Sequence, residues 1–353
     1  REKEEIAENA KVEVKGENFG SGNKNYTIPI PKCGDLICNA TIENCSSCPQ
    51  DCLCACNNNL ICEKNESAPS CPSDCFKKQP IKPGKIVMAD YDAEQRTNGR
   101  VNISLLINSL KNASVNTYAF LLWHNPAYDW QDFLLFVDAA NKSNIDAYVY
   151  LVPPTENCYN VLPYGCTLNA WAVAIANLSL KYPNLKGWAI DDFTLGTKPN
   201  NFTRGYVANF AYLAYSINPN LSFYPVLYSD TLFSQRTNVL KYSNFIDGAI
   251  YPFFSFNGSC NLNDSYHLEE DIQKFNDYYS NLSLNLIIMD YATSHSNCGK
   301  PTAAYVHDVT SMGLEKAKTG MTAGVMQYCL PKTTTSAGSF YDIVRKIYSN
   351  YSS

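Results

Sequence analysis

Two adjacent carboxylates, Asp191 and Asp192, end an apolar run that begins at Trp188. Two further aspartates, Asp90 and Asp290, stand at the ends of other apolar runs. Burying an unpaired carboxylate costs free energy, so each of these groups must have a partner, be solvated in a cleft or have a shifted pKa. Because all three outcomes are typical of a functional site, the candidate catalytic residues are Asp90, Asp191, Asp192 and Asp290.

Aromatic and polar side chains end most of the other apolar runs. This mixture suits sugars, because flat rings stack on the apolar faces of pyranoses while carboxylates accept hydroxyl hydrogen bonds or transfer protons. A second interpretation is that the tyrosines simply fill the core. The candidate substrate-binding residues are Asp92, Trp123, His124, Tyr150, Tyr228, Tyr251, Tyr291 and Gln327.

A repeating fold must position these residues, because short apolar runs alternate eight times with stretches of helical periodicity. The expected strands are 85–90, 117–123, 147–152, 187–191, 222–228, 248–252, 284–290 and 322–328. The expected helices are 102–112, 129–143, 168–181, 203–217, 268–280, 302–317 and 336–348, with a short one near 237–242. The pattern predicts an α/β fold, a (β/α)8 TIM barrel over 84–353, since a doubly wound open sheet would normally need fewer strands.

The carboxyl ends of the strands form the active-site mouth of such a barrel. Alternation along the fourth strand places Gly187, Ala189 and Asp191 on one face. Large apolar side chains on the other face would contact helices, so we expect Asp191 to point into the mouth and Asp192 to start the loop. The acids of this strand and Asp290 should then converge on one cleft lined by Trp123, Tyr150, Tyr251 and Gln327.

Two carboxylates in one cleft indicate hydrolysis of glycosidic bonds. Their separation is roughly 5 to 5.5 Å in retaining enzymes and roughly 6.5 to 9.5 Å in inverting ones. Asp191 would be the nucleophile or base, and Asp290 or Asp192 the acid, with its pKa raised by aromatic neighbours and a second carboxylate. Asp90 is an alternative partner for Asp191. We expect no metal and no cofactor at this site.

The composition indicates an extracellular or cell-surface protein. The chain has 15 Cys and many Asn-x-Ser/Thr sequences, and we expect that a signal peptide has been removed. No apolar run is long enough to span a membrane, and a net charge of -5 without a basic cluster argues against nucleic acid or an anionic membrane as a partner. The expected glycosylation sites are Asn25, Asn39, Asn44, Asn65, Asn102, Asn112, Asn141, Asn177, Asn201, Asn220, Asn257, Asn263, Asn281 and Asn350.

Ten of the cysteines lie in a duplicated module that we place at 33–78, ahead of the barrel. Both halves end in Cys-Pro-x-Asp-Cys, at Cys52 and at Cys75. Four-cysteine spacing could hold zinc, but an oxidising compartment and an even count favour disulfides in a segment with almost no core. The connectivity stays open, and calcium binding by Asp35, Glu43 and Asp51 is an alternative reading of the loops. The cysteines expected in bridges here are Cys33, Cys38, Cys45, Cys48, Cys52, Cys54, Cys56, Cys62, Cys71 and Cys75.

The five cysteines of the barrel leave at least one unpaired. Cys158 and Cys166 bracket a short loop excursion and should pair. Cys260 and Cys298 lie in neighbouring loops at the same end of the barrel, where a bridge would join them. Cys329 is then the free thiol, and no His stands in a recognisable catalytic arrangement with it.

Three stretches of the barrel carry a family resemblance: Val152-Pro153-Pro154, the segment 182–193 and Ile217-Asn218-Pro219-Asn220. They resemble an uncharacterised family of secreted barrels grouped loosely with glycoside hydrolases. The module resembles short Cys-Gly-Asp cystine repeats of secreted microbial proteins. The acid cluster is also similar to that of chitinase-like barrels, but Thr194 stands where their proton donor would be. The resemblance therefore implies binding or hydrolysis of a polysaccharide or glycan, without a chitinase mechanism.

An alternative of another class is a structural subunit of an extracellular surface layer or filament, with a vestigial barrel site. The segment 1–32 is charged at its start and then rich in Gly and Asn, with alternation at Tyr26, Ile28 and Ile30. Such a segment buries little apolar surface by itself. We expect it to be an extended tail that binds another copy of the chain by strand addition, so that the protein self-associates as a homo-oligomer.

Overall fold

The computed structural model describes residues 56, 59–62, 66–193, 202–257, 259–295 and 297–352. The chain divides into two compact units, 1–54 and 55–353, and the described residues belong to the second. The tail 1–32 with its predicted self-association, most of the predicted cystine bridges and the candidate calcium ligands lie outside the described residues.

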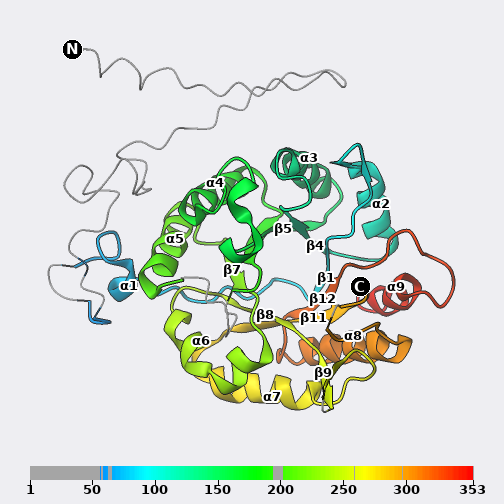
Figure 1. The fold of residues 1–353 in the computed structure, drawn as a ribbon. Helices are drawn as coiled ribbons and strands as arrows, with labels where there is room; N and C mark the ends of the chain where they lie inside the picture. The colour runs from blue at the N-terminus through cyan, green and yellow to red at the C-terminus, as the bar shows by residue number, and fades with distance from the viewer. Residues whose placement is uncertain are drawn as a thin grey trace. The chain divides into compact units, whose positions relative to one another are not determined.

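The second unit is a (β/α)8 barrel, as the sequence predicts (Figure 1). Its parallel strands are β1 (Val87–Tyr91), β4 (Thr117–Leu121), β5 (Asp146–Leu151), β6 (Leu185–Ile190), β7 (Ser222–Pro225), β8 (Gly248–Pro252), β11 (Asn285–Tyr291) and β12 (Gly324–Tyr328). They pair in the order β7-β6-β5-β4-β1-β12-β11-β8. A bridge between Val226 and Ile250, and a 2.9 Å hydrogen bond from the Leu227 amide to the Ile250 carbonyl, join the two ends and close the barrel.

One helix follows each strand and packs around the outside of the ring (Figure 1). These helices are α2 (Ile103–Asn112), α3 (Asp129–Asn141), α4 (Leu168–Lys181), α5 (Arg204–Ile217), α6 (Arg236–Tyr242), α7 (Leu268–Tyr279), α8 (Ala303–Lys318) and α9 (Phe340–Ser349). Side-chain caps start several of them; Thr203, for example, accepts a hydrogen bond from the Tyr206 amide at 3.2 Å. Among the described residues no helix has the length and apolar character needed to cross a bilayer.

The strands are buried along most of their length: Lys186 near the start of β6 is exposed, and Asp146 at the start of β5 and Tyr328 at the end of β12 are half-buried. Two-sided burial is expected of parallel strands covered by helices. Close strand contact requires glycine at the start of β12, because a Cβ on Gly324 would lie 2.0 Å from the Val87 carbonyl oxygen. The core therefore fixes the register that places the strand ends around the mouth.

Two antiparallel hairpins decorate the mouth loops. β2 (Arg96–Thr97) pairs with β3 (Arg100–Val101) after β1, and β9 (Ser255–Asn257) pairs with β10 (Ser259–Asn261) after β8. Both predicted barrel disulfides are confirmed: Cys158 is bonded to Cys166, and Cys260 to Cys298. Cys329 is the free cysteine of the described residues, also as predicted.

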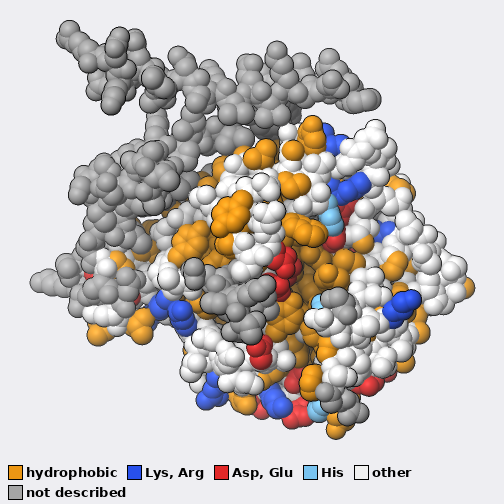
Figure 2. Space-filling model, in the orientation of Figure 1, with side chains coloured by type: hydrophobic (Ala, Val, Ile, Leu, Met, Phe, Trp, Pro, Cys, Tyr) orange, Lys and Arg blue, Asp and Glu red, His pale blue; other side chains and the backbone are white. Residues whose placement is uncertain are grey.

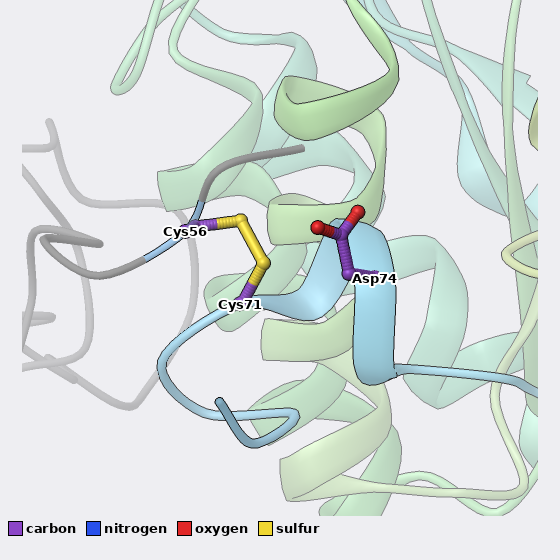
Figure 3. A group of neighbouring side chains, drawn as sticks. All are labelled: Cys56, Cys71 and Asp74. Carbon is purple, nitrogen blue, oxygen red and sulfur yellow. A yellow bond between two sulfur atoms is a disulfide. The ribbon is translucent and has the colours of Figure 1, made fainter. Parts of the chain in front are cut away.

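The second half of the cystine module lies in the same compact unit as the barrel, whereas the sequence predicts a module that ends at 78. The division falls between Cys54 and Ala55, inside the duplication. Cys56 pairs with Cys71, which precedes the short helix α1 (Pro72–Cys75), and Cys62 pairs with Cys75, the last residue of that helix. Figure 3 shows the Cys56–Cys71 bond beside Asp74, so these sulfur atoms are not free to bind zinc.

Aromatic packing attaches this half-module to the barrel. The Phe76 ring contacts Tyr212 and Tyr215 of α5 and Phe245, with centroids 5.1 to 6.1 Å apart. The Arg204 guanidinium donates to the Ser73 carbonyl at 2.7 Å. The half-module therefore shares a core with the helices instead of forming a separate appendage.

A buried ion pair closes the amino-terminal end of the barrel. Lys78 Nζ lies 2.5 Å from Asp247 Oδ2, and both side chains are almost completely buried. The other Asp247 oxygen accepts a hydrogen bond from the Ile81 amide at 2.8 Å. The chain that leaves the half-module is thereby fixed across the end opposite the mouth.

Candidate functional site

Asp191 points into the mouth from the end of β6. Its Oδ1 accepts hydrogen bonds from the Tyr150 hydroxyl and from the Asp192 amide, both at 3.0 Å. Trp188, on the other face of the strand, packs against Phe210 of α5, so the alternation predicted from the sequence is observed. Burial and the charge of Asp192 raise the pKa of Asp191 to about 7, although the two hydrogen bonds oppose the shift.

Asp192 begins the loop after β6, where we expected it. Its φ of 40° lies in the left-handed region, which costs a non-glycine residue free energy and is often tolerated at functional sites. The Tyr228 hydroxyl donates to Asp192 Oδ1 at 2.6 Å. This turn directs two adjacent carboxyl groups to one end of the barrel.

Glu156 is the third acid of the mouth and is not among the site residues predicted from the sequence. It ends a 3-10 turn (Pro154–Glu156) in the loop after β5 and is partly exposed. Its pKa is raised to about 8 by burial, by a hydrogen bond with Asp192 and by the charges of Asp191 and Asp192. Because burial, the hydrogen bond with Asp192 and the nearby negative charges all act in the same direction, the protonated form of Glu156 is favoured. The sequence offers one indication of this residue: Glu156 is an acidic residue five positions after Leu151, where β5 ends.

Tyrosine rings form the floor around these acids. Tyr91 lies 4.3 Å from Tyr150 and 5.3 Å from Tyr328, and Tyr328 stacks on Tyr291 at 4.5 Å between ring centroids. The negative charge of Asp191 contributes to the raised pKa of each of these four hydroxyls, after burial as the main cause. Figure 2 shows acidic side chains among hydrophobic ones near the centre of this face. The predicted mixture of carboxylates and rings is therefore present in one place.

Phe254 and His295 form a wall beyond the strand ends of β8 and β11. The Phe254 ring lies 6.1 Å from Tyr228, 4.8 Å from Tyr291 and 5.0 Å from His295. Burial lowers the pKa of His295 although the charge of Asp192 acts against it, and its Nδ1 has no hydrogen-bond partner among the described residues. His295 thus offers a neutral ring at the mouth.

A second polar cluster follows β1 and β4. His124 Nε2 lies 2.7 Å from Asp92 Oδ1, and Glu94 Oε2 accepts from the Tyr118 hydroxyl at 2.9 Å. Burial would raise the pKa of Asp92, but the hydrogen bond and charge of His124 hold it below its usual range. Burial and the charge of Asp92 raise the pKa of Glu94 despite Arg96. Asp92 and His124 are therefore at the mouth, as expected.

The cluster of Asp92, Glu94 and His124 brings three potential metal ligands within 4.8 Å of one another. These donors suit a divalent transition metal. They already bind each other, Tyr118 and the Arg96 guanidinium, which pairs with Glu94. With their charges compensated in this way, we assign the cluster no metal, and the sequence prediction of a metal-free site stays a prediction.

Three predicted site residues lie outside the mouth, which corrects their placement. Asp90, Gln327 and Asp290 are paired in register across β1, β12 and β11 and are fully buried. The next residues in each strand, Tyr91, Tyr328 and Tyr291, form the floor, so alternation turns the three earlier side chains toward the helices.

Contacts on the helix side satisfy these three side chains in part. Lys332 Nζ lies 2.6 Å from Asp90, and Asp290 accepts from the Thr310 hydroxyl of α8 at 2.6 Å. The Gln327 amide donates to Thr310 at 2.9 Å. Burial raises the pKa of Asp90 to about 6 despite Lys332, and that of Asp290 to about 8 despite its hydrogen bonds.

The remaining candidates divide between the mouth and the helix layer. Tyr251 is not in the mouth, because its hydroxyl donates to Asp271 of α7 at 2.7 Å. Trp123 lies at the rim, 46% exposed, and its indole Nε1 donates to the Glu156 carbonyl at 3.2 Å. The structure thus brings together Asp92, Trp123, His124, Tyr150, Asp191, Asp192, Tyr228 and Tyr291, and adds Tyr91, Glu94, Glu156, Phe254, His295 and Tyr328.

The arrangement can supply both forms of a carboxyl group. Glu156 holds a proton up to about pH 8, while the Tyr150 hydroxyl and the Asp192 amide stabilise an ionised Asp191. Two carboxyl groups whose surroundings give them different pKa values can act as the acid and the base of one reaction. The aromatic floor can hold a ring-shaped substrate between them.

No protein-family model and no curated protein matches this chain. Among solved structures it is similar to a glucosidase from Croceicoccus marinus, with 10% identity and a TM-score of 0.52 over 77% of this chain and 68% of that one. An endocellulase from Pyrococcus horikoshii, in complex with cellotetraose, aligns with 11% identity and a TM-score of 0.47 over 76% of this chain and 93% of that one. The likeness to the glucosidase shows the fold alone, and the chain has the (β/α)8 barrel also found in that glycoside hydrolase.

Proposed function

We propose that this chain is a secreted glycoside hydrolase that cleaves a polysaccharide or glycan at the carboxyl end of its barrel. One observation carries the proposal: Glu156, Asp191 and Asp192 interact directly, and the pKa of Glu156 is raised to about 8. A carboxylic acid that stays protonated at neutral pH, close to a second carboxyl group that can ionise, is what glycosidic cleavage requires.

Glu156 replaces Asp290 and Asp192, the two residues suggested from the sequence, as the proposed acid. It would protonate the oxygen of the leaving sugar while Asp191 acts as nucleophile or as base toward water, and Tyr150 stabilises its charge. Asp192, whose carboxyl group accepts from Tyr228, would favour the protonated form of Glu156 through their hydrogen bond. Bound substrate would then replace Asp192 as the hydrogen-bond partner of Glu156. Tyr91, Tyr291 and Tyr328 would support the sugar ring from below.

Secretion and N-glycosylation belong to the same proposal. The four disulfides of the described residues favour an oxidising compartment. Each acceptor asparagine with a described side chain is exposed, as a glycan requires: Asn102, Asn112, Asn141, Asn177, Asn220, Asn263, Asn281 and Asn350. Glycopeptide mapping of protein from a secreting host should find glycans at these positions, whereas unmodified peptides throughout would contradict this part of the proposal.

The catalytic proposal is tested by incubating the purified full chain with a panel of polysaccharides and measuring released reducing ends. The Glu156→Gln variant should lose activity by about 10² to 10⁴-fold, the usual contribution of a positioned acid. Glu315→Gln is the matched control, because Glu315 is an exposed acid of α8 outside the mouth. Hydrolysis that persists in Glu156→Gln, or an intact chain without activity on any glycan, would contradict the proposal.

A further inference from the structure

We infer that Trp123 forms the subsite for the leaving sugar, so that a bound glycan runs across the mouth from the Phe254 and His295 wall toward the Trp123 rim. The inference rests on the proposed function and adds a direction to it. Trp123, Phe254 and His295 come from the loops after β4, β8 and β11, and these loops contribute to the same end of the barrel.

The position of Trp123 beside the loop that carries the acid is the basis of the argument. Its indole Nε1 donates to the main-chain carbonyl of Glu156 at 3.2 Å, while 46% of the residue's surface stays exposed. A proton donor must lie next to the oxygen of the leaving group, since it protonates that atom. The sugar that departs with this oxygen would therefore lie against the residue that borders Glu156.

The rim at Trp123 is also held in place before any ligand binds. The Trp123 amide donates to Asp129 Oδ2 at 2.8 Å, and the same oxygen accepts from the Asn125 amide at 2.9 Å. The other Asp129 oxygen accepts from the Arg96 guanidinium at 2.7 Å. Because the loop is already ordered and the indole N–H already bonded, stacking a sugar there costs little conformational entropy.

The wall beyond β8 and β11 suits the sugar that retains the anomeric carbon. Phe254 contacts Tyr228, whose hydroxyl donates to Asp192. Asp192 is also close enough to His295 for its charge to favour a higher pKa of that ring. The Cys260–Cys298 disulfide joins the loops that carry this wall. A sugar ring that lies against Phe254 and His295 would place its anomeric carbon over the acids, with the leaving sugar extending toward Trp123.

Kinetics with two kinds of substrate test this assignment. On the polysaccharide that the intact chain degrades, Trp123→Ala should raise KM about tenfold, as expected for losing an aromatic stacking surface. On glycosyl fluorides of the same sugar, whose leaving group is a single fluoride ion that makes no contact with Trp123, kcat/KM should stay within about twofold, because the reacting sugar lies elsewhere. Trp123→Phe keeps a ring and should lie within about threefold of the intact chain on both substrates.

Tyr278→Ala is the matched control, because Tyr278 is an exposed aromatic of α7, 39% accessible, near the end of that helix. Cleavage of oligosaccharides labelled at the reducing end should shift in Trp123→Ala, since the labelled fragment is the one that leaves. Equal losses on both substrate types, or an unchanged KM and cleavage pattern, would overturn the subsite while leaving the proposed function intact. If the intact chain cleaves no glycan, the proposed function and the subsite both fail.

Discussion

The carboxyl groups of Glu156 and Asp192 are hydrogen-bonded to each other, although the two residues come from loops after different strands. Two carboxyl groups in contact cannot both ionise without strong repulsion, so the pair retains one proton. The raised pKa of Glu156 favours the proton on that residue, and both side chains are half-buried at the mouth. The barrel therefore brings together two loops whose acidic residues favour a protonated Glu156, the proton donor that the proposed reaction needs.

The alkaline limit of activity should depend on Glu156. Because the acid must be protonated and its pKa is about 8, kcat/KM should fall as pH rises through about 8. In Glu156→Gln the remaining activity should not fall as the pH rises through about 8, since the glutamine has no proton to lose in this range. A profile of kcat/KM from pH 5 to 10 for both proteins gives the comparison, and an alkaline limb retained by the variant would exclude Glu156 as its source.

The acid limit should depend on Asp191 and Tyr150. Asp191 must be ionised to act, and its pKa is about 7, so activity should rise through that pH. Tyr150→Phe removes a hydrogen bond that stabilises the ionised form, which should raise the pKa of Asp191 and move the acid limb up by about 1 pH unit. A limb that stays in place, measured by the same profile, would show that Tyr150 does not tune this group.

Asp290 should lower stability at high pH without taking part in catalysis. Its folded pKa is about 8, whereas an unfolded aspartate titrates near about 3.9. The folded chain therefore binds the extra proton, so the stabilising contribution is full below about pH 4 and is lost progressively as pH rises to about 8.

Asp290→Asn stays neutral and can still accept from Thr310. Its free energy of unfolding should exceed that of the intact chain by on the order of 2 kcal/mol at pH 8 to 9. The difference should shrink toward pH 4, as followed by denaturant unfolding. A gap independent of pH would mean that Asp290 does not titrate in this range.

The closure of the barrel's amino-terminal end should depend on Lys78. Lys78→Ala leaves the Asp247 carboxylate buried without its ion partner and should cost about 3 to 5 kcal/mol of unfolding free energy. Lys85→Ala, which breaks the exposed pair with Asp146, should cost at most about 1 kcal/mol. Similar losses in the two variants would show that burial does not set the strength of the Lys78 pair.

The sequence predicts the barrel well because each unit has its own local signal. All eight strands and the eight helices that follow them lie within a few residues of the expected ranges, and even the short helix near 237–242 is present as α6. Hydrophobic periodicity and caps such as Thr203 depend on neighbouring residues, so they can be read without knowledge of tertiary contacts.

The site was harder to predict because it depends on alternation at single positions. For Asp191 the large neighbour Trp188 revealed which face points outward, and the placement is confirmed. For Asp90 and Asp290 the tyrosines one position later occupy the mouth, so the acids face the helices instead. Glu156 lies in a loop, whose path follows no periodicity, and its contact with Asp192 is visible only in three dimensions.

The central claim is that Glu156 donates the proton to the leaving sugar. The most direct test compares Glu156→Gln with the intact chain on two substrates of the same sugar, one with an ordinary sugar leaving group and one with a dinitrophenyl group that departs without protonation. We predict a loss of about 10³-fold on the first and less than about tenfold on the second, because only the first needs the acid. Equal losses on both substrates would contradict the assignment of Glu156 as the acid.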